Sequence, residues 1–265
     1  MISCSTRSFC SGWFTMSEEF GTEVPPGATI VHEPHGFVRL VTYNATDLMV
    51  VNAARVSFRK RSDWAAELED GTGGILEEAV EKVLRFLLKN KHGTPFEHTH
   101  FLFHIRAPIF VFREWHRHRI GVSINEESAR YVPLKPDFYF PDNAHCRRQV
   151  GKPGHYTFEQ MKPDTAERVV RRSMGRAYFV AYATYEDLLA NGVAKEIARA
   201  VLPVGIYSQM YWTCNARSLM NFLGLRNAPT ALMEIRDYAQ AMESIFAEKM
   251  PVTCSAFVDN GRVAP

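Results

Sequence analysis

The stretch THFLFHIR at residues 99–106 alternates between apolar and polar side chains, and it decides the fold class. Its apolar residues would share one face of a strand, because side chains in a strand alternate with a period of two. These residues are Phe101, Phe103 and Ile105. Pro108 follows at once and suits the first turn of a helix, which we expect to run to about Arg119. The stretch therefore predicts a half-buried strand that leads directly into a helix.

The segments on either side of this stretch add strands and a helix. Residues 36–44, GFVRLVTYN, alternate in the same way and predict a second strand. A loop rich in glycine and charge at 59–74 separates that strand from a helical run at 75–88. Residues 137–140 predict a further short strand. These segments favour a central, mostly antiparallel sheet.

The C-terminal half is mainly helical by its pattern. Asp164 with Glu167 three residues later resembles a capping box and predicts a long helix that reaches Leu189 and stops at Asn191-Gly192. Residues 230–250 are amphipathic. Their apolar side is formed by Ile235, Tyr238, Ala239, Met242, Ile245 and Phe246. Since no repeat or linker divides the chain, we expect one α+β domain, with long helices flanking the sheet.

Residues 215–226 predict another helix, whose ends are marked by particular side chains. Asn215 is a typical N-cap, and Arg217 and Asn221 are four residues apart and therefore share a face. Gly224 is expected to end the helix. Arg226 would then lie in the following loop, free to reach a ligand.

The first fifteen residues, MISCSTRSFCSGWFT, lack the continuous apolar stretch of a signal peptide. The next four, MSEE, read like a natural start. We therefore expect residues 1–15 to be a disordered leader or to precede the true initiator Met16. The single domain would then occupy residues 16–265.

Composition excludes several classes of protein. Lysine and arginine total 31 against 29 aspartate and glutamate in 265 residues, and this near-balance argues against a nucleic-acid coat. The five cysteines are odd in number and have no C-x-x-C spacing, so a cytoplasmic protein without a disulfide framework is expected. No apolar run approaches the roughly 18 residues of a membrane span, so no membrane partner is expected.

The centre of the chain is rich in histidine and arginine. Six of the ten histidines lie between His92 and His118, and Arg113, Arg117, Arg119 and Arg130 lie in the same region. The planar fork of arginine suits phosphate, so this region predicts a site for phosphorylated ligands.

On the expected central helix, Glu114, Arg117 and His118 stand at i, i+3 and i+4 and would share a face. Taken alone, this pattern is as typical of an exposed ion pair, which contributes roughly 0–1 kcal/mol. His98, His100 and His104 do not form an H-E-x-x-H or Cys/His pattern, so no metal site is expected there or elsewhere.

Residues 117–131 read RHRIGVSINEESARY. R-H-R, a short loop and then S-x-N-E-x-S-x-R-Y resemble the signature of the flavin-dependent thymidylate synthases. Four more segments resemble that family in the expected order. They are NAARVS at 52–57, HGTPFEH at 92–98, IARAVLP at 197–203 and NARSLMNFLGLR at 215–226. The resemblance covers about residues 52–257, except 59–74 and 143–164.

The chain departs from the family pattern at two places. Eight residues stand between Arg119 and Ser128, where the family has seven, and we expect the extra residue within 120–122. Gly121 could accommodate it in a small bulge with positive φ. Glu114 stands where many members carry glutamine.

The resemblance implies a homotetrameric enzyme with shared active sites, which methylates dUMP to dTMP. FAD would carry the hydride, NADPH would reduce the flavin, and methylenetetrahydrofolate would donate the carbon. The implied cofactor contacts are Ser57, His92, Thr94, Arg117, His118, Arg119, Glu126, Asn215, Ala216, Arg217 and Asn221. The implied dUMP contacts are Glu114, Trp115, His116, Arg117, Glu127, Ser128, Ala129, Arg130, Arg199 and Arg226.

Two of these residues have distinct implied roles. Arg226 is the expected catalytic residue, because a guanidinium at the uracil edge stabilises an anionic pyrimidine. Ser128 has no base and orienting group beside it in the sequence, so we expect it to bind phosphate rather than attack the base.

Two other hypotheses remain open. The extra loop residue and Glu114 are compatible with a flavoprotein of related fold that acts on another pyrimidine nucleotide. The basic centre is compatible with a non-catalytic RNA-binding protein, which would be colourless and would bind RNA with a steep salt dependence.

Overall fold

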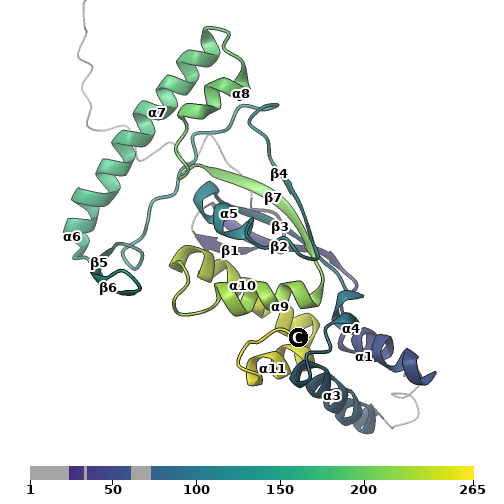
Figure 1. The fold of residues 1–265 in the computed structure, drawn as a ribbon. Helices are drawn as coiled ribbons and strands as arrows, with labels where there is room; N and C mark the ends of the chain where they lie inside the picture. Colours follow the sequence, from purple (N-terminus) through teal and green to yellow (C-terminus); the bar gives the residue numbers. More distant parts are fainter. Residues whose placement is uncertain (1–23, 33–34, 61–72) are drawn as a thin grey trace, which may run out of the picture.

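The computed structural model describes residues 24–32, 35–60 and 73–265, so the expected leader and most of the loop at 59–74 lie outside the described residues. A five-stranded antiparallel sheet runs through the molecule (Figure 1). In spatial order its strands are β1 (Thr29–His32), β2 (Gly36–Tyr43), β3 (Phe101–Pro108), β7 (Tyr207–Cys214) and β4 (Val122–Glu126). The expected α+β fold is confirmed.

The two central strands, β3 and β7, supply the buried face of the sheet. Phe101, Phe103 and Ile105 are fully buried, as the alternation predicts. Phe103 stands opposite Trp212 in the register, and the two rings stack with centroids 6.1 Å apart. Burying side chains of this size supplies much of the free energy that holds helices against a sheet.

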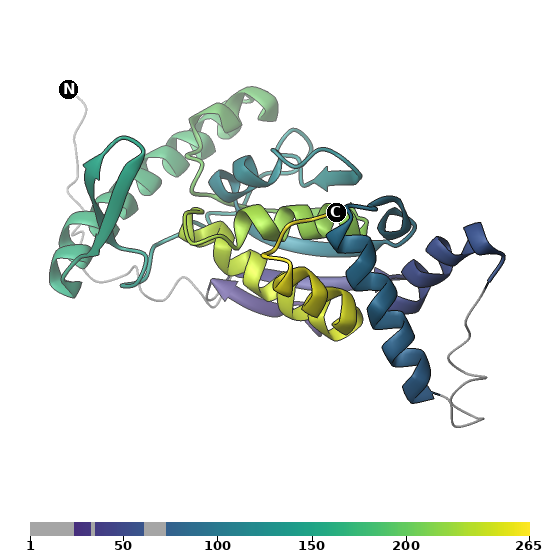
Figure 2. The same ribbon diagram turned by 60° about the horizontal axis from the view of Figure 1, so that its bottom comes forward.

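The buried face is covered by helices from the C-terminal part of the chain (Figures 1 and 2). They are α9 (Ala216–Arg226), α10 (Met233–Lys249) and α11 (Pro251–Asp259). The amphipathic pattern of α10 is confirmed: Ile235, Tyr238 and Met242 have no exposed surface.

A group of N-terminal helices lies at one end of the sheet (Figure 1). They are α1 (Asp47–Arg55), the 3-10 turn η1 (Val56–Phe58), α3 (Gly73–Lys89) and α4 (Thr94–Glu97). The helix α3 packs against α1 and α11, so it joins the two ends of the chain.

The opposite face of the sheet carries polar and aromatic side chains that are only partly buried. Nε2 of His104 lies 2.9 Å from the Gln209 side chain, and the imidazole stacks on Tyr211 at 4.9 Å. His104 is therefore held by its neighbours, and burial lowers its pKa. His100 precedes β3, and its backbone N–H donates to Asn44.

A long helical segment and a hairpin extend from the sheet (Figure 1). The helical segment consists of α6 (Pro163–Thr165), the π-helical turn η2 (Ala166–Arg171) and α7 (Arg172–Ala190). It is followed by α8 (Lys195–Ala198) and η3 (Arg199–Val201). The hairpin pairs β5 (Arg147–Lys152) with β6 (His155–Gln160).

Several predicted boundaries are wrong. The N-cap of the long helical segment is Lys162, and Glu167 bonds Arg171 and Arg172 instead of completing a capping box. At the other end, Asn191 and Gly192, with φ of 76°, close α7 as expected. Residues 137–140 form a single bridge, Phe138 to Ile206, and not a strand.

Two corrections matter for the site. The central helix α5 (Ile109–Trp115) ends four residues before Arg119, so Glu114, Arg117 and His118 do not share a helical face. Gly224 does not end α9, and Arg226 belongs to the last helical turn. A Cβ at Gly224 would lie 2.5 Å from the Arg262 carbonyl oxygen, so this glycine permits close packing of backbone on backbone.

Within the described ranges, none of the helices combines the length and apolar character needed to cross a bilayer.

Candidate functional site

Arg226 is the centre of a polar cluster between α5 and α9. Its Nη1 donates to the Glu114 carboxylate at 2.5 Å, and its Nη2 donates to the Glu114 carbonyl oxygen at 2.9 Å. Its Nε donates to His118 Nε2 at 2.9 Å. We call Glu114, His118 and Arg226 the guanidinium cluster. The Arg226 side chain is 17% exposed, so its charge lies in a partly dehydrated environment where electrostatic effects are strong.

His118 is held as a neutral acceptor in this cluster. Because Arg226 donates to Nε2, the ring proton must reside on Nδ1. Burial, followed by the nearby Arg226 charge, lowers the pKa of His118 to about 4. The Phe222 ring packs against the imidazole at 5.0 Å and fixes its orientation. Near neutral pH the cluster therefore contains one guanidinium, one carboxylate and one uncharged imidazole.

The N-terminus of α9 forms a second polar group with the loop before β4. Asn215 caps α9 by accepting from the Ser218 N–H at 2.8 Å, which confirms the predicted N-cap. The Ser218 hydroxyl donates to the Ile120 carbonyl oxygen, and the Ala216 N–H donates to the Thr99 hydroxyl. Gly121 has φ of 65°, as predicted for the residue that accommodates the longer loop.

Gly121 also lies unusually close to α9. A Cβ there would stand 2.5 Å from Ser218 Oγ and 2.7 Å from Asn215 Nδ2. A shallow pocket of about 340 Å³ opens beside this group. Its lining combines polar and apolar groups: Thr99, His100, Gly121, Val122, Ser123, Thr213, Cys214 and Asn215. The start of an 11-residue helix beside such a pocket suits an anionic ligand.

Arg217 connects α9 with α4. Its Nη1 donates to Glu97 at 2.5 Å, and its Nε donates to the Pro265 carbonyl oxygen at 2.8 Å. The guanidinium lies directly over Gly93, where any Cβ would collide with it. The two segments at 92–98 and 215–226, far apart in the sequence, therefore meet here.

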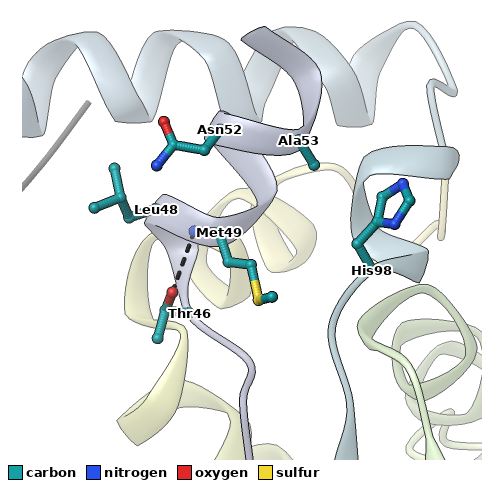
Figure 3. A pocket seen from close by; sticks show the side chains of 6 residues that line it. All are labelled: Thr46, Leu48, Met49, Asn52, Ala53 and His98. Atoms are coloured by element: carbon teal, nitrogen blue, oxygen red, sulfur yellow. Dashed lines mark hydrogen bonds between the residues drawn. The ribbon is translucent and has the colours of Figure 1, made fainter. Parts of the chain in front are cut away.

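A larger pocket of about 440 Å³ lies between α1 and the end of α4 (Figure 3). Figure 3 shows Met49 and Ala53 of α1 on one side and the His98 ring on the other. Thr46, Leu48 and Asn52 complete the lining. The pocket thus brings together the segments at 52–57 and 92–98, although none of its lining residues is among the predicted contacts.

The chain leaves β4 into a tight turn at residues 127–131. The Ser128 carbonyl oxygen accepts from Tyr131 N–H at 3.0 Å, and its hydroxyl accepts from Arg130 N–H at 3.3 Å. Two residues of α8 secure the turn. Glu196 accepts from Arg130 Nε at 3.2 Å, and Lys195 donates to the Tyr131 carbonyl oxygen at 2.9 Å.

Arg199 follows in the exposed turn η3 beside α8. Ser128 and Arg130 lie in this turn, and Arg199 follows the two α8 residues that hold it; we call these three predicted residues the turn cluster. The basic side chains and the exposed backbone of this cluster could hold a phosphate.

The start of α9 and the turn cluster lie toward opposite ends of β4 (Figure 1). Val122 pairs with Cys214, next to the start of α9, whereas Glu126 pairs with Met210 and leads to the turn near α8. The strand spans about 13 Å at roughly 3.3 Å per residue. No hydrogen bond or ion pair within the described part of the chain joins the guanidinium cluster to the turn cluster.

The remaining predicted residues fall into two groups. Some are exposed and accessible to a ligand: Ser57, His92, Thr94, Arg117, Arg119 and Asn221. Among the residues that the structure describes, Arg117 and Arg119 make no hydrogen bond or ion pair. In contrast, Trp115 and Ala216 have no exposed surface in side chain or backbone, so this structure does not present them to a ligand.

His116 and Glu126 lie across the start of the loop from each other. Their side chains are 3.6 Å apart, which is longer than a hydrogen bond, and the imidazole stacks on Phe112. Glu127 continues the strand pairing through its N–H to the Gln209 carbonyl oxygen. Ala129 is buried below the turn and packs with Leu134 and Ile206.

The sequence does not reveal the residues that hold the predicted contact residues in place. Thr99, Ser218, Lys195 and Glu196 hold predicted residues through hydrogen bonds. The motif at 92–98 contains Gly93, but the sequence does not reveal that the Arg217 guanidinium packs directly against this glycine. Only Ser218, at the N3 position after the N-cap, carries a local sequence signal.

Comparison with known proteins gives consistent results. A family model described as thymidylate synthase complementing protein matches residues 39–252. The chain is similar to the flavin-dependent thymidylate synthase of Streptomyces coelicolor, with 47% identity over 235 residues that cover 86% of this chain and 93% of the relative. It is also similar to that of Tropheryma whipplei, with 44% identity over 241 residues that cover 86% and 94%.

A solved relative is the UMP/dUMP methylase PolB from Streptomyces cacaoi. Its crystal structure bound with 5-Br UMP matches with a TM-score of 0.76 and 43% identity, covering 89% of this chain and 99% of that chain. Its structure bound with 5-Br dUMP matches with a TM-score of 0.74 and 44% identity, covering 86% and 97%.

Proposed function

This chain belongs to the thymidylate synthase complementing protein family, and from that premise we propose that it methylates dUMP to dTMP reductively. FAD carries the hydride, NADPH reduces the flavin, and methylenetetrahydrofolate donates the carbon. The observation that supports this proposal best is the guanidinium cluster. A basic residue of the family motif is held in place by an acid and a neutral imidazole.

The proposed reaction requires carbon 5 of uracil to become electron-rich. A guanidinium at the uracil edge favours the anionic pyrimidine, and it does so most strongly when it is fixed before substrate binds. His118 and Glu114 hold Arg226 by all three of its nitrogens, so little reorganisation is needed. His118 remains uncharged near pH 7, so it orients Arg226 without adding a second positive charge.

The residues around α9 fit a flavin nucleotide. The pocket at the start of α9 is lined by hydroxyl, amide and imidazole groups, and the exposed Arg117 and Arg119 offer charge for a pyrophosphate. Gly121 brings the loop backbone close to Asn215 and Ser218, so the ligand can approach both. When bound, the flavin supplies the redox chemistry, and the protein binds and orients it.

The turn cluster is the proposed phosphate site of dUMP. Within the described residues, Ser128 makes only local turn hydrogen bonds, with Arg130, Tyr131 and Val132, and none with a base that could activate it. This supports a binding role for its hydroxyl and argues against a covalent role. Arg130 and Arg199 would neutralise the phosphate charge.

We further propose a homotetramer in which each active site draws on more than one chain. The supporting observation is that, within the described residues of one chain, no hydrogen bond or ion pair joins the guanidinium cluster to the turn cluster. A nucleotide that contacts Arg226 by its base and Ser128 by its phosphate is readily accommodated if the clusters come from neighbouring chains. Exposed apolar side chains on α7 and α8, including Val180 and Ile197, offer surface for such an assembly.

Purified protein tests the proposal in two steps. A flavin absorption spectrum is expected after purification, and colourless protein that binds RNA would instead favour the non-catalytic hypothesis. Protein supplied with FAD, NADPH, methylenetetrahydrofolate and dUMP is expected to form dTMP, detected by chromatography. Failure of dTMP formation by the flavin-loaded protein would contradict the proposal.

A second candidate function is methylation of UMP as well as dUMP. The solved relative described as a UMP/dUMP methylase favours it, because that protein is covered over 99% of its length at 43% identity. Parallel assays with dUMP and UMP separate the two functions. Product from dUMP alone supports the narrower function, and comparable product from both supports the broader one.

A further inference from the structure

A second cluster of titratable side chains lies on the other side of the molecule from the flavin pocket, and the proposed reaction does not use it. His32 ends β1, His145 lies in a turn at 142–146, and Asp237 is on α10. One ligand atom from each residue lies within 4.8 Å of the other two. From this geometry we propose that His32, His145 and Asp237 bind a divalent transition-metal ion, and that zinc is the best match.

The separations of the ligand atoms suit a tetrahedral ion. Nε2 of His145 is 2.8 Å and Nε2 of His32 is 3.9 Å from Oδ2 of Asp237. Zinc bonds of about 2.0–2.1 Å at tetrahedral angles place ligand atoms about 3.3 Å apart. These two distances lie on either side of that value, and all three ligand atoms lie within 4.8 Å of one another, so shifts of roughly 0.5–1.5 Å would enclose the ion. Two imidazoles and one carboxylate, with water as fourth ligand, are a typical donor set for zinc.

The surroundings of His145 support ligation independently. Its Nδ1 lies 2.7 Å from Oδ1 of Asp142, and the same oxygen accepts from the His145 backbone N–H at 2.9 Å. This arrangement fixes the ring and leaves Nε2 directed at Asp237. Metal-binding histidines commonly donate their second ring nitrogen to a carboxylate, which orients the ring and raises its basicity.

The charge around the cluster also favours a cation. Asp142, Asp237 and Glu234 lie around it, and only His145 among the cluster residues bears a compensating proton. Glu234 is 7% exposed, and its Oε2 makes no hydrogen bond within the described structure. Its Oε1 accepts from Tyr139, whose ring packs against His32. A divalent ion would offset the negative charge of the buried Glu234 and the partly buried Asp237.

Binding exchanges protons for metal in a balanced way. Hydrogen bonds to Asp237 and Asp142 raise the pKa of His145 to about 9, so a metal ion at neutral pH must displace the Nε2 proton of His145. His32 is neutral because burial lowers its pKa. Its Nε2 donates to the Glu234 carbonyl oxygen at 3.3 Å, so ligation must give up this hydrogen bond and move the ring proton to Nδ1. One proton is therefore released for each ion bound near pH 7.

The ion would join three segments that are distant in the sequence. They are the end of β1, the turn before β5 and the middle of α10. No local spacing of histidines reveals such a site, which explains why the sequence predicts no metal. The role that follows is stabilisation of the contact between this turn and α10, and not participation in methyl transfer.

Zinc titration of the full chain tests the proposal. The protein is first stripped with EDTA, and Cys4 and Cys10 are replaced by serine to remove thiols outside the described residues. Calorimetry is expected to show one Zn²⁺ per chain, with release of about one proton in buffers of different ionisation enthalpy. Cobalt should give the intense visible absorption of a tetrahedral complex.

Matched variants make the test specific. Asp142→Asn is expected to weaken Zn²⁺ binding by roughly 10- to 100-fold, which is the usual effect of losing an outer carboxylate. His32→Gln removes a ligand but keeps the Asp142–His145–Asp237 contacts, and it should weaken binding more. His155→Gln, on the exposed hairpin, should change nothing. Equal Zn²⁺ affinity in the wild type and His32→Gln, or no binding by the wild type at millimolar zinc, overturns the proposal.

Discussion

At the scale of single residues, Arg226 has the most informative environment in the molecule. Its three nitrogens all find acceptors within the chain, so its position is fixed before any nucleotide arrives. A lysine could not reproduce this arrangement, because an ammonium group lacks the planar fork of a guanidinium. The side chain is therefore best understood as a preset charge beside the proposed uracil site.

Replacing Arg226 should separate chemistry from cofactor binding. Arg226→Ala and Arg226→Lys are expected to lower dTMP formation by at least about 100-fold, since a preorganised donor typically contributes 10²–10³ in rate. Most of the flavin should remain bound, as measured by the visible spectrum after gel filtration. Arg236→Ala on α10 serves as the control and should retain activity. Complete loss of flavin from the Arg226 variants would show that this residue binds the cofactor instead.

Gly121 is the second residue whose substitution should have a specific effect. Gly121→Ala must place a side chain at positive φ and within 2.5 Å of Ser218 Oγ. Gly192→Ala is a matched control, because Gly192 also has positive φ but no neighbouring atom within 4 Å. Both variants should lose about 1 kcal/mol or more of stability from backbone strain.

Only Gly121→Ala should also release flavin, because only this glycine approaches the pocket at the start of α9. Flavin retention and urea unfolding measure the two effects separately. Equal flavin retention in both variants would contradict the proposed location of the cofactor. Deletion of Val122, by contrast, would disturb strand register, because this residue of β4 pairs with Cys214 of β7.

At the scale of secondary-structure elements, the sequence predicts those strands and helices that have one buried face. The alternation in β3 and the amphipathic face of α10 are strong signals, because each element has one buried side. The end of α5 is not predicted, since neither glycine nor proline follows Trp115. Its position is set by a tertiary contact: His118 turns away from the helix to meet Arg226 on α9. The exposed hairpin β5–β6 has no buried face and hence no pattern.

The same dependence on local pattern explains which site residues the sequence does not reveal. Motif residues such as Ser128 and Arg199 can be named from the sequence, but the α8 residues that hold the turn cannot. Lys195 and Glu196 lie more than 60 positions from their partners. Gly224 shows the limit of local rules, because a glycine near a helix end usually marks a C-cap. Here a glycine is required by the close approach of the Arg262 backbone, and α9 continues past it to Arg226.

The turn at 142–146 and α10 should be coupled through the protonation of His145. Its pKa is raised to about 9 by Asp237 and Asp142, so the folded protein holds this proton more tightly than the unfolded chain. The resulting stability is fully present below about pH 6.5 and is lost as pH rises through 9. His118, with its pKa lowered to about 4, has the opposite sign and loses stability as pH falls from 6.5 toward 4.

Urea unfolding in EDTA between pH 4 and 9.5 measures both effects. His145→Gln is expected to flatten the decline of unfolding free energy above pH 6.5 and to leave the acid side unchanged. His155→Gln provides an exposed control and should retain both slopes. An alkaline decline that persists unchanged in His145→Gln would mean that the contacts with Asp142 and Asp237 do not govern it.

At the scale of the whole molecule, the proposed sharing of active sites makes a direct prediction. Arg226→Ala disables the guanidinium cluster, whereas Arg199→Ala disables the turn cluster. Each variant alone should be nearly inactive. If sites are shared, an equal mixture that is unfolded and refolded together should recover about one quarter of wild-type activity, because random pairing in a symmetric oligomer leaves that fraction of sites intact.

Recovery of activity is measured against each variant refolded alone, and the assembly is sized by light scattering. A mixture that stays inactive while forming mixed oligomers would place both clusters of each site in one chain. Refolded wild type, carried through the same procedure, gives the reference yield.

If the guanidinium cluster and the turn cluster of one site come from different chains, the rate of product formation also depends on dilution. A single chain would then contain no complete active site. Specific activity should therefore fall once the chains are diluted below the concentration at which they associate. An assay at very low enzyme concentration would then underestimate the turnover number. The loss of activity would increase with the time allowed for the oligomer to dissociate after dilution. In a cell, the abundance of the chain would set both the number of sites and the fraction that is complete. Output would therefore rise more steeply than in proportion to the amount of protein made.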